Sequence, residues 1–347
     1  MNTPYPRITG WGKYLPSRVL TNAELERMVE TSDEWIFART GIRERRIASE
    51  AETAAAMATA AARDALDVAG VAADDVDLVI VATTTPDNVM PAVACAVQAA
   101  LGARHAAAFD LNAACSGFVY GLVVASQFIA AGGYRRVLVI GSEVFSRLID
   151  WSDRNTCVLF GDGAGAVLVE ADTESGGPFA FVLGSDGSGA NALHMPASWR
   201  PLTELWTRDT SMSEPPRFIQ MDGPEIFKFA VTIMARVTLD VVAAAGMDLD
   251  DIALFIPHQA NDRIIAAAAR ALRLPRERFF VNLDHYGNTS AASVPIALCE
   301  AVATGRLRCG DRVVMVGFGG GLTWAAVVME WRPRQSSASD IAASEGR

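Results

Sequence analysis

Apolar runs and polar breaks alternate along this chain, with lengths typical of strands and helices in turn. After an opening strand, Thr21-x-x-Glu24 and Thr31-x-x-Glu34 each predict a capping box that starts a short helix. Residues 39–46 are interpreted as a basic turn. The other elements predicted in the first half are an Ala-rich helix at 53–68, a buried strand at 76–82, a helix at 91–101 with proline in its first turn, a strand at 106–111, an uncharged helix at 116–130 and a strand at 136–141.

The second half continues the same alternation. Between the halves, residues 156–170 place G-D-G-A-G-A between apolar runs and predict a hairpin packed closely against another element. Residues 195–216 lack periodicity and predict a surface loop, and residues 332–347 form a polar tail. The elements predicted for this half are helices at 224–245, 262–272 and 291–304 and strands at 252–257 and 312–317.

Two stretches of the chain repeat at a fixed offset of 176 positions. Residues 64–83 align without a gap on 240–259, and residues 136–141 fall on 312–317 at the same offset. A constant offset indicates a duplicated α/β half, because chance matches would drift in register. We therefore expect two βαβ-type halves packed against each other, at 1–173 and 174–331. The strand end that carries Thr83 in the first copy carries His258 in the second.

Composition narrows the class of protein. The 347 residues are 51% hydrophobic and 20% charged, with a net charge of −10, which argues against a general nucleic-acid binder. The chain has two lysines, and its five cysteines show neither C-x-x-C pairs nor zinc spacing. The start of the chain has no apolar signal core, so a cytoplasmic setting is expected. Residues 111–134 are uncharged but contain polar residues and four glycines, which favours a helix buried between layers over insertion in a membrane.

Four candidate functional features lie next to predicted strands and helices. Cys115 stands between a strand and the uncharged helix, where a helix N-terminus lowers the pKa of a thiol, although many cysteines are simply small buried hydrophobes. His258 ends a buried strand, where α/β folds place their chemistry. Asn288 precedes a helix and is equally suited to cap a turn. The segment G-F-G-G-G-L-T-W at 317–324 could bring backbone amides to a substrate oxygen or form a tight turn.

Read together, the motifs resemble one known family. They are T-S-D-E-W-I (31–36), R-T-G-I-R-E-R (39–45), A-A-C-S-G-F (113–118), F-G-D-G-A-G-A (160–166), P-H-Q-A-N (257–261), H-Y-G-N-T-S-A-A-S-V-P (285–295) and the glycine segment at 317–324. From about residue 7 to 331 the chain resembles β-ketoacyl-acyl-carrier-protein synthase III, a condensing enzyme of the thiolase superfamily. The resemblance implies a duplicated α/β fold layered α-β-α-β-α, with two pseudo-symmetric halves and mixed sheets.

The resemblance also implies a reaction. Cys115 would take an acyl group from coenzyme A, with the amides of Cys115 and Gly320 as the oxyanion hole. His258 and Asn288 would hydrogen-bond the thioester carbonyl of malonyl-acyl-carrier protein while CO2 leaves. The resulting carbanion would attack the acyl-cysteine and give a 3-oxoacyl-carrier protein, which initiates fatty acid synthesis. Neither a metal nor a cofactor other than the coenzyme A thioester substrate is implied.

Further residues are assigned by resemblance alone. The family's coenzyme A site maps onto Thr31, Trp35, Arg39, Arg154, Gly223 and Asn261, with Trp35 and Arg154 around the adenine. An acidic carrier protein would dock at Lys228, Arg263 and Arg270. Many relatives carry a phenylalanine that crosses a homodimer into the partner's acyl pocket. Here that residue is Met90, whose flexible side chain leads us to expect primers longer than acetyl.

Three alternatives stay open at this stage. A related acyltransferase or condensing enzyme of secondary metabolism would use the same acyl-cysteine without serving fatty acid synthesis. A Cys–His–Asn thioester hydrolase would use the histidine to activate water. A binding module without activity would keep Cys115 buried and inert.

Overall fold

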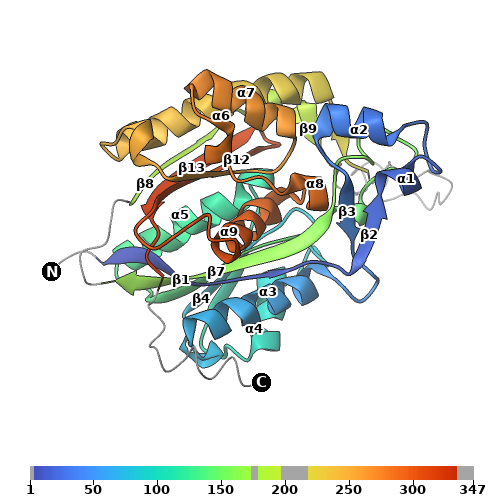
Figure 1. Cartoon of the computed structure of the whole chain (residues 1–347). Coiled ribbons are helices and arrows are strands. Elements are labelled where there is room, and N and C mark those ends of the chain that lie inside the picture. Colours follow the sequence, from blue (N-terminus) through green and yellow to red (C-terminus); the bar gives the residue numbers. More distant parts are fainter. Residues whose placement is uncertain (1–3, 173–178, 197–217, 334–347) are drawn as a thin grey trace.

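Two mixed β-sheets separate three layers of helices, giving the order α-β-α-β-α (Figure 1). The computed structural model describes residues 4–172, 179–196 and 218–333. The predicted duplicated α/β architecture is confirmed. The boundary predicted at residue 173, the predicted loop at 195–216 except residues 195 and 196, and the tail beyond residue 333 lie outside the described residues.

Both sheets combine parallel and antiparallel pairs, and the first has one more strand and one more parallel pair than the second. In the first sheet the order is β1-β7-β6-β4-β5, with β4 parallel to both β5 and β6. In the second sheet the order is β11-β12-β13-β8, with β11 parallel to β12. The strands are β1 (Tyr5–Tyr14), β4 (Leu78–Ala82), β5 (Ala107–Leu111), β6 (Arg136–Val144), β7 (Asp162–Asp172), β8 (Phe179–Ser185), β11 (Leu254–Pro257), β12 (Arg312–Gly319) and β13 (Thr323–Glu330).

Six helices make the three layers. The middle layer holds α5 (Gly117–Ala130) and α9 (Ser293–Ala303), and the outer layers hold α3 (Ala54–Ala69) with α4 (Val93–Leu101) and α6 (Gly223–Ala244) with α7 (Asp262–Leu272). The smaller elements are β2 (Arg18–Thr21), α1 (Asn22–Leu25), α2 (Asp33–Thr40), β3 (Glu44–Ile47), β9 (Leu193–His194), β10 (Gln220–Met221) and α8 (Leu283–Tyr286).

The uncharged stretch at 111–134 is explained by its place between the sheets. It contains the whole of α5, whose Phe118, Leu122 and Ile129 are fully buried in a core shared with both sheets. A helix with apolar neighbours on both sides has no exposed face on which a charge would be solvated. Within the described residues, no helix is both long and apolar enough to cross a bilayer.

The repeat is visible in local geometry. Gly70 and Gly246, which are 176 positions apart, both adopt the left-handed conformation, with φ of 64° and 67°. Each follows an outer helix and leads through a short 3-10 turn into the first parallel strand of its sheet. Glycine suits both positions because a side chain there would be strained.

The predicted hairpin at 156–170 is wrong. Its second part belongs to one long strand, β7, which pairs with β1 on one side and β6 on the other. The close packing that the glycines predict is present, since a Cβ on Gly165 would lie 2.8 Å from Pro295 Cβ and from the Ile296 nitrogen. Glycine in β7 therefore lets α9 approach the sheet rather than allowing a turn.

Two predicted helix starts also need correction. The capping box of Thr21 and Glu24 is present, but Ser32 rather than Thr31 caps α2 and accepts the Trp35 N–H at 3.1 Å. Helix α4 begins at Val93, after Pro91 instead of with it in the first turn. Its start is fixed from another strand, because the Asp110 carboxylate on β5 accepts the N–H groups of Val93 and Ala94, each at 2.8 Å.

The predicted basic turn at 39–46 is correct only in part. Helix α2 ends at Gly41, in the left-handed conformation, but the residues that follow form strand β3. Arg45 on β3 is fully buried, and its guanidinium donates to the Leu20 and Val158 carbonyls and to Asn22 Oδ1. Tertiary contacts therefore hold this charged segment in a strand with one buried arginine.

Candidate active site

Cys115 lies on a tight turn between β5 and α5. The turn is a 3-10 segment, Ala114–Ser116, and Ala114 adopts φ of +46°. The same geometry recurs at the equivalent position 176 residues later, where Ser290 has φ of +48° and begins the 3-10 turn before α9. Positive φ costs a non-glycine residue about 1–2 kcal/mol, so the surrounding fold must hold both turns in place.

The glycine segment packs directly on the Cys115 turn. A Cβ on Gly319 would lie 2.9 Å from Cys115 Cβ and 3.2 Å from its sulfur. Thr323 Oγ1 links the two segments, at 2.9 Å from the Ala113 carbonyl oxygen and 3.0 Å from that of Gly320. Glycine is therefore required at residue 319, because the backbone there lies against the turn that carries Cys115.

His258 is held by two contacts at the end of β11. Its backbone N–H donates to the Val316 carbonyl at 2.7 Å, and its ring Nδ1 lies 2.7 Å from Ser293 Oγ. The side chain is buried, and burial lowers the pKa of His258 to about 3. The imidazole is therefore neutral at physiological pH.

Asn288 combines a capping role with an available donor. Its Oδ1 accepts the Ser290 N–H at 2.9 Å, while its backbone N–H donates to Leu159 and its carbonyl accepts from Gly161. The cap uses the oxygen of the carboxamide, and among the described residues no partner is recorded for its Nδ2. Asn288 can therefore cap the turn with its oxygen and still offer its Nδ2 as a donor to a substrate.

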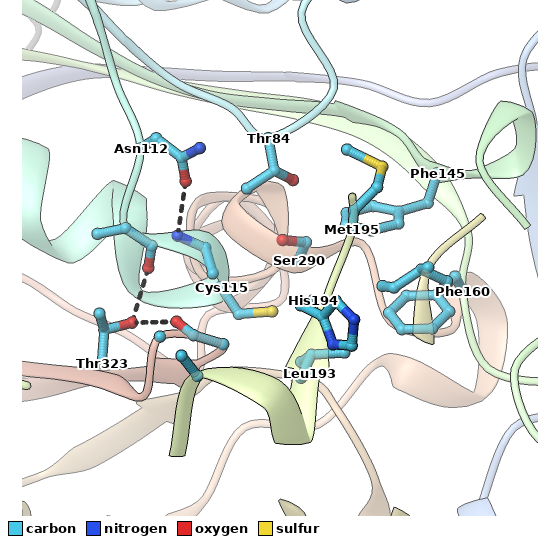
Figure 2. A pocket seen from close by; sticks show the side chains of 16 residues that line it. Thr84, Asn112, Cys115, Phe145, Phe160, Leu193, His194, Met195, Ser290 and Thr323 are labelled. Carbon is cyan, nitrogen blue, oxygen red and sulfur yellow. Dashed lines mark hydrogen bonds between the residues drawn. The ribbon is translucent and has the colours of Figure 1, made fainter. Parts of the chain in front are cut away.

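Cys115, His258 and Asn288 line one cavity of about 150 Å³. Cys115 also faces a second cavity of about 370 Å³, and Figure 2 shows its side chain entering that cavity near Thr84, Ser290 and His194. The second cavity is lined by apolar residues as well, including Phe145, Phe160, Leu193, Met195 and Ile219. The thiol is only 5% exposed, yet it lies where two cavities meet.

A third, outer cavity of about 650 Å³ adjoins the one that holds His258. The two share five lining residues, which are Leu159, Met221, Gly223, Phe227 and Asn261. The shared lining indicates one path from the surface past Asn261 to Cys115 and on into the cavity behind it. This arrangement suits a long substrate with its reactive group in the interior.

The expected low pKa of Cys115 is wrong for the unliganded site. Burial raises the pKa of the Cys115 thiol to about 12; a hydrogen bond with Ser290 lowers it and the Glu143 carboxylate raises it further. Cys115 does lie just before α5, but water cannot solvate a thiolate there. The Cys115 side chain is therefore a neutral thiol at physiological pH.

Four of the six predicted coenzyme A residues line the outer cavity: Trp35, Arg39, Gly223 and Asn261. Arg154 lies outside that lining but has its guanidinium carbon 5.1 Å from the centre of the Trp35 ring. Arg39 lies over the same ring at 4.9 Å. Thr31 is not among the lining residues, and its buried hydroxyl has no hydrogen-bond partner.

The residues assigned to partners are exposed. Lys228 is exposed on α6, and Arg263 and Arg270 are exposed on α7. Arg263 also lines the outer cavity. Met90 is 86% exposed in a single chain and does not line the cavity behind Cys115.

Sequence reasoning missed Glu143, Ser290 and Ser293. Glu143 carried a usable signal, because an acidic residue within the buried strand R-V-L-V-I-G-S-E-V is costly unless it has partners. Ser290 also had a signal in the sequence, because the 176-residue offset aligns it with Ala114, which is next to Cys115. Ser293 had no such signal, because its contact with His258 arises only from packing.

Comparison with known proteins agrees with this site. Family models match residues 109–187 (3-oxoacyl-[acyl-carrier-protein (ACP)] synthase III) and 242–331 (its C-terminal part). A beta-ketoacyl-[acyl-carrier-protein] synthase III of Roseiflexus sp. (strain RS-1) is 54% identical over 94% of this chain and 98% of the relative. The crystal structure of 3-oxoacyl-[acyl-carrier-protein] synthase III from Aquifex aeolicus VF5 is 48% identical, with a TM-score of 0.86 over 94% of this chain and 100% of the other.

Another solved structure, a priming beta-ketosynthase of a polyketide biosynthetic pathway, is 38% identical with a TM-score of 0.88 and covers 96% of this chain and 98% of its own. A duplicated thiolase-like fold with a cysteine on a buried turn is that of a condensing enzyme of the acyltransferase type. At this level of identity over nearly the whole chain, the protein belongs to the β-ketoacyl-acyl-carrier-protein synthase III family. The predicted fold and family are thus confirmed.

Proposed function

We propose that the protein condenses an acyl-coenzyme A primer with malonyl-acyl-carrier protein and so initiates fatty acid synthesis. In the first step Cys115 takes the acyl group. In the second, malonyl-acyl-carrier protein loses CO2 and its carbanion attacks the acyl-cysteine, which gives a 3-oxoacyl-carrier protein. The observation that carries this proposal is the single cavity lined by Cys115, His258 and Asn288.

Neutral donors suit the decarboxylation step. When CO2 leaves, negative charge develops on the thioester oxygen, and fixed hydrogen-bond donors stabilise it without having to reorganise. The Ser293 hydroxyl can donate to His258 Nδ1, because its oxygen already accepts the Gln259 N–H. That tautomer places the ring proton of His258 on Nε2, and Asn288 Nδ2 supplies the second donor. For the acyl-transfer step we assign the oxyanion hole to the amides of Cys115 and Gly320.

The geometry fits a Cys–His–Asn hydrolase less well. In that class the asparagine orients the histidine so that it can act as a base. Here Asn288 Oδ1 is bonded to the Ser290 amide, and Ser293 is the residue bonded to His258. The low pKa of His258 also makes it a weak base.

The primer binds in two parts in this proposal. The acyl chain enters the cavity behind Cys115, and the coenzyme A portion occupies the outer cavity at Trp35, Arg39, Gly223 and Asn261. Trp35 and Arg154 are in direct contact in the free protein, so an adenine can enter between them only if Arg154 moves away. We assign Thr31 as a hydrogen-bond donor to the nucleotide, since its hydroxyl has no partner among the described residues.

We place the carrier protein at the mouth of this path. Lys228, Arg263 and Arg270 give α6 and α7 exposed positive charges on a chain whose net charge is −10. An acidic carrier protein would be attracted to such a patch and repelled by much of the remaining surface. The reaction is assigned to the cytoplasm, where the five free cysteines stay reduced.

The proposed function is tested by the intact mass of the protein after mixing with a panel of acyl-coenzyme A compounds. We expect the mass to rise by one acyl group, and the label to map to Cys115. Subsequent addition of malonyl-acyl-carrier protein should remove the acyl group, release CO2 and form 3-oxoacyl-carrier protein. Acylation followed only by hydrolysis would instead support the hydrolase.

We further propose that the protein is a homodimer in which Met90 reaches the partner's acyl cavity. Strand β5 is the outer strand of its sheet, and Val89 and Met90 beside α4 are 85% and 86% exposed. Large apolar side chains exposed together with an unpaired strand edge are typical of an interface between subunits.

Replacing Met90 with phenylalanine is expected to shift primer preference toward shorter chains, because a rigid ring fills space that a thioether leaves adaptable. The measurement is the rate of Cys115 acylation across acyl-coenzyme A chain lengths, for protein whose oligomeric state is checked in solution. Leu239→Phe is a suitable control, since Leu239 is also exposed and apolar but lines a different cavity. An unchanged chain-length profile in Met90→Phe would contradict the assignment.

A further inference from the structure

Glu143 is a buried carboxylate that the condensation proposed above does not use. It lies near the end of β6, and several donors from the segment after β4 converge on it. The Thr84 amide is 3.1 Å from Oε2, the Thr84 hydroxyl is 3.0 Å from Oε1, and the Thr85 hydroxyl is 2.7 Å from Oε2. Burial nevertheless raises the pKa of Glu143 to about 7, against the lowering effect of these hydrogen bonds. The group can therefore exchange a proton near neutral pH.

Ser290 connects this carboxylate to the nucleophile. Its Oγ lies 3.0 Å from Glu143 Oε1, and Ser290 and Cys115 line the same cavity, where the hydroxyl lowers the pKa of the thiol. A hydroxyl has one proton and two lone pairs, so Ser290 can accept from the thiol while it donates to the carboxylate. The strained turn at Ser290 fixes the hydroxyl between the two groups.

We propose that Glu143 is a positioning residue that receives the Cys115 proton through Ser290 when the acyl group is transferred. The proposal rests on Cys115 being the nucleophile of the proposed function. The thiol proton moves to Ser290 Oγ while the Ser290 proton moves to Glu143 Oε1. The sulfur electron pair forms the new bond to the acyl carbon, and the coenzyme A sulfur leaves with the old one. Glu143 ends as a neutral acid, and the departing thiolate takes a proton from solvent.

The relay removes an electrostatic conflict. Glu143 and Cys115 cannot both be negative at low cost, because each charge disfavours the other in a buried site. Moving the proton from one to the other keeps a single negative charge in the network. Among the described residues, the other recorded partners of Glu143 are uncharged: the Thr84 amide and the hydroxyls of Thr83, Thr84 and Thr85.

Two neighbouring titratable groups are engaged elsewhere. Asp162, on the adjacent strand β7, binds the amides of Ala48 and Ser146. His258 faces Cys115 across the smaller cavity and is neutral. An inflection near neutral pH in the reactivity of Cys115 is therefore assigned to Glu143.

The test uses alkylation of Cys115 by iodoacetamide, followed by mass spectrometry of the peptide that contains it. Wild-type reactivity should rise with pH, pass an inflection near the pKa of about 7 and then level off, because the ionised form of Glu143 is the proton acceptor. Glu143→Gln should react about 10²-fold more slowly at neutral pH. Its rate should climb steadily with pH without levelling, because only free thiolate then reacts.

Ser290→Ala should show the same slow rate and the same loss of the plateau. The double variant should be no slower than either single one, because both remove one relay. Thr83→Val loses a 3.4 Å contact with Glu143 and the bond from the Thr85 amide to Thr83 Oγ1 at 3.1 Å, but it leaves Ser290 in place and should keep the wild-type inflection. Melting temperatures identify a variant that fails to fold. In that case the pH profile of the other single variant tests the relay.

A plateau retained in both single variants, or additive losses in the double variant, would overturn the relay. The same pH series is then repeated with an acyl-coenzyme A as the electrophile in single-turnover measurements. Loss of acylation in the wild type together with the expected alkylation profile would reject the proposed function and leave the relay intact.

Discussion

Replacing Cys115 with alanine is expected to abolish acylation and to lower the rate of condensation by at least about 10⁴-fold. The variant has no sulfur to form the thioester, and the Ser290 hydroxyl, which lines the same cavity, is bonded to Glu143. Thioester exchange is favourable for sulfur because the leaving group and the nucleophile are chemically alike. Intact mass after mixing with acyl-coenzyme A measures the first effect, and formation of 3-oxoacyl-carrier protein measures the second.

The Cys115→Ala variant should lose condensation and keep decarboxylation. Because the proposed enolate donors are His258 and Asn288, Cys115→Ala should still release CO2 from malonyl-acyl-carrier protein. Cys309→Ala, at an exposed cysteine, is the matched control and should be acylated like the wild type. Substantial condensation by Cys115→Ala, or acylation at another cysteine, would contradict the assignment of the nucleophile.

The fold was largely predictable because its elements are duplicated. A helix end, an acidic turn and a buried strand recur at one offset, and the structure places Gly70 and Gly246 in the same conformation. Errors arose where distant residues decide local structure. Residues 156–170 contain turn-forming glycines, but β1 and β6 on either side hold their second part in one strand. Similarly, the start of α4 is fixed by the Asp110 carboxylate, whereas the proline in the sequence did not predict the right first residue.

The sequence predicted three residues that the structure places in one cavity, but it did not predict the electrostatics of that cavity. Cys115, His258 and Asn288 stand at strand or helix ends that the pattern places at one edge of the fold, and the motifs identify them. A pKa, however, depends on burial and on neighbours from other elements. The helix end at Cys115 is visible in sequence, but the loss of water and the presence of Glu143 are not. This is why the expected direction of the Cys115 shift was wrong.

Replacing His258 or Asn288 with alanine is expected to lower condensation about 10²- to 10³-fold, the usual cost of removing one donor from a developing oxyanion. Acylation of Cys115 by the primer should stay near the wild-type rate, since these donors serve the second step. Because burial lowers the pKa of His258 to about 3, the neutral ring persists well below the ordinary value of 6.5. Acidification through that value should therefore not remove the contribution of His258.

The decisive measurement compares three rates in each variant: Cys115 acylation, CO2 release from malonyl-acyl-carrier protein, and formation of the 3-oxoacyl product. Decarboxylation and condensation should fall together, because one enolate precedes both. His285→Ala is the control, since this histidine is exposed and lies 3.6 Å from Glu44, in an ion pair when protonated. If His258→Ala lost acylation and kept decarboxylation, the assignment would be wrong. The imidazole would then act on the Cys115 thiol, which is the role assigned above to the Glu143–Ser290 relay.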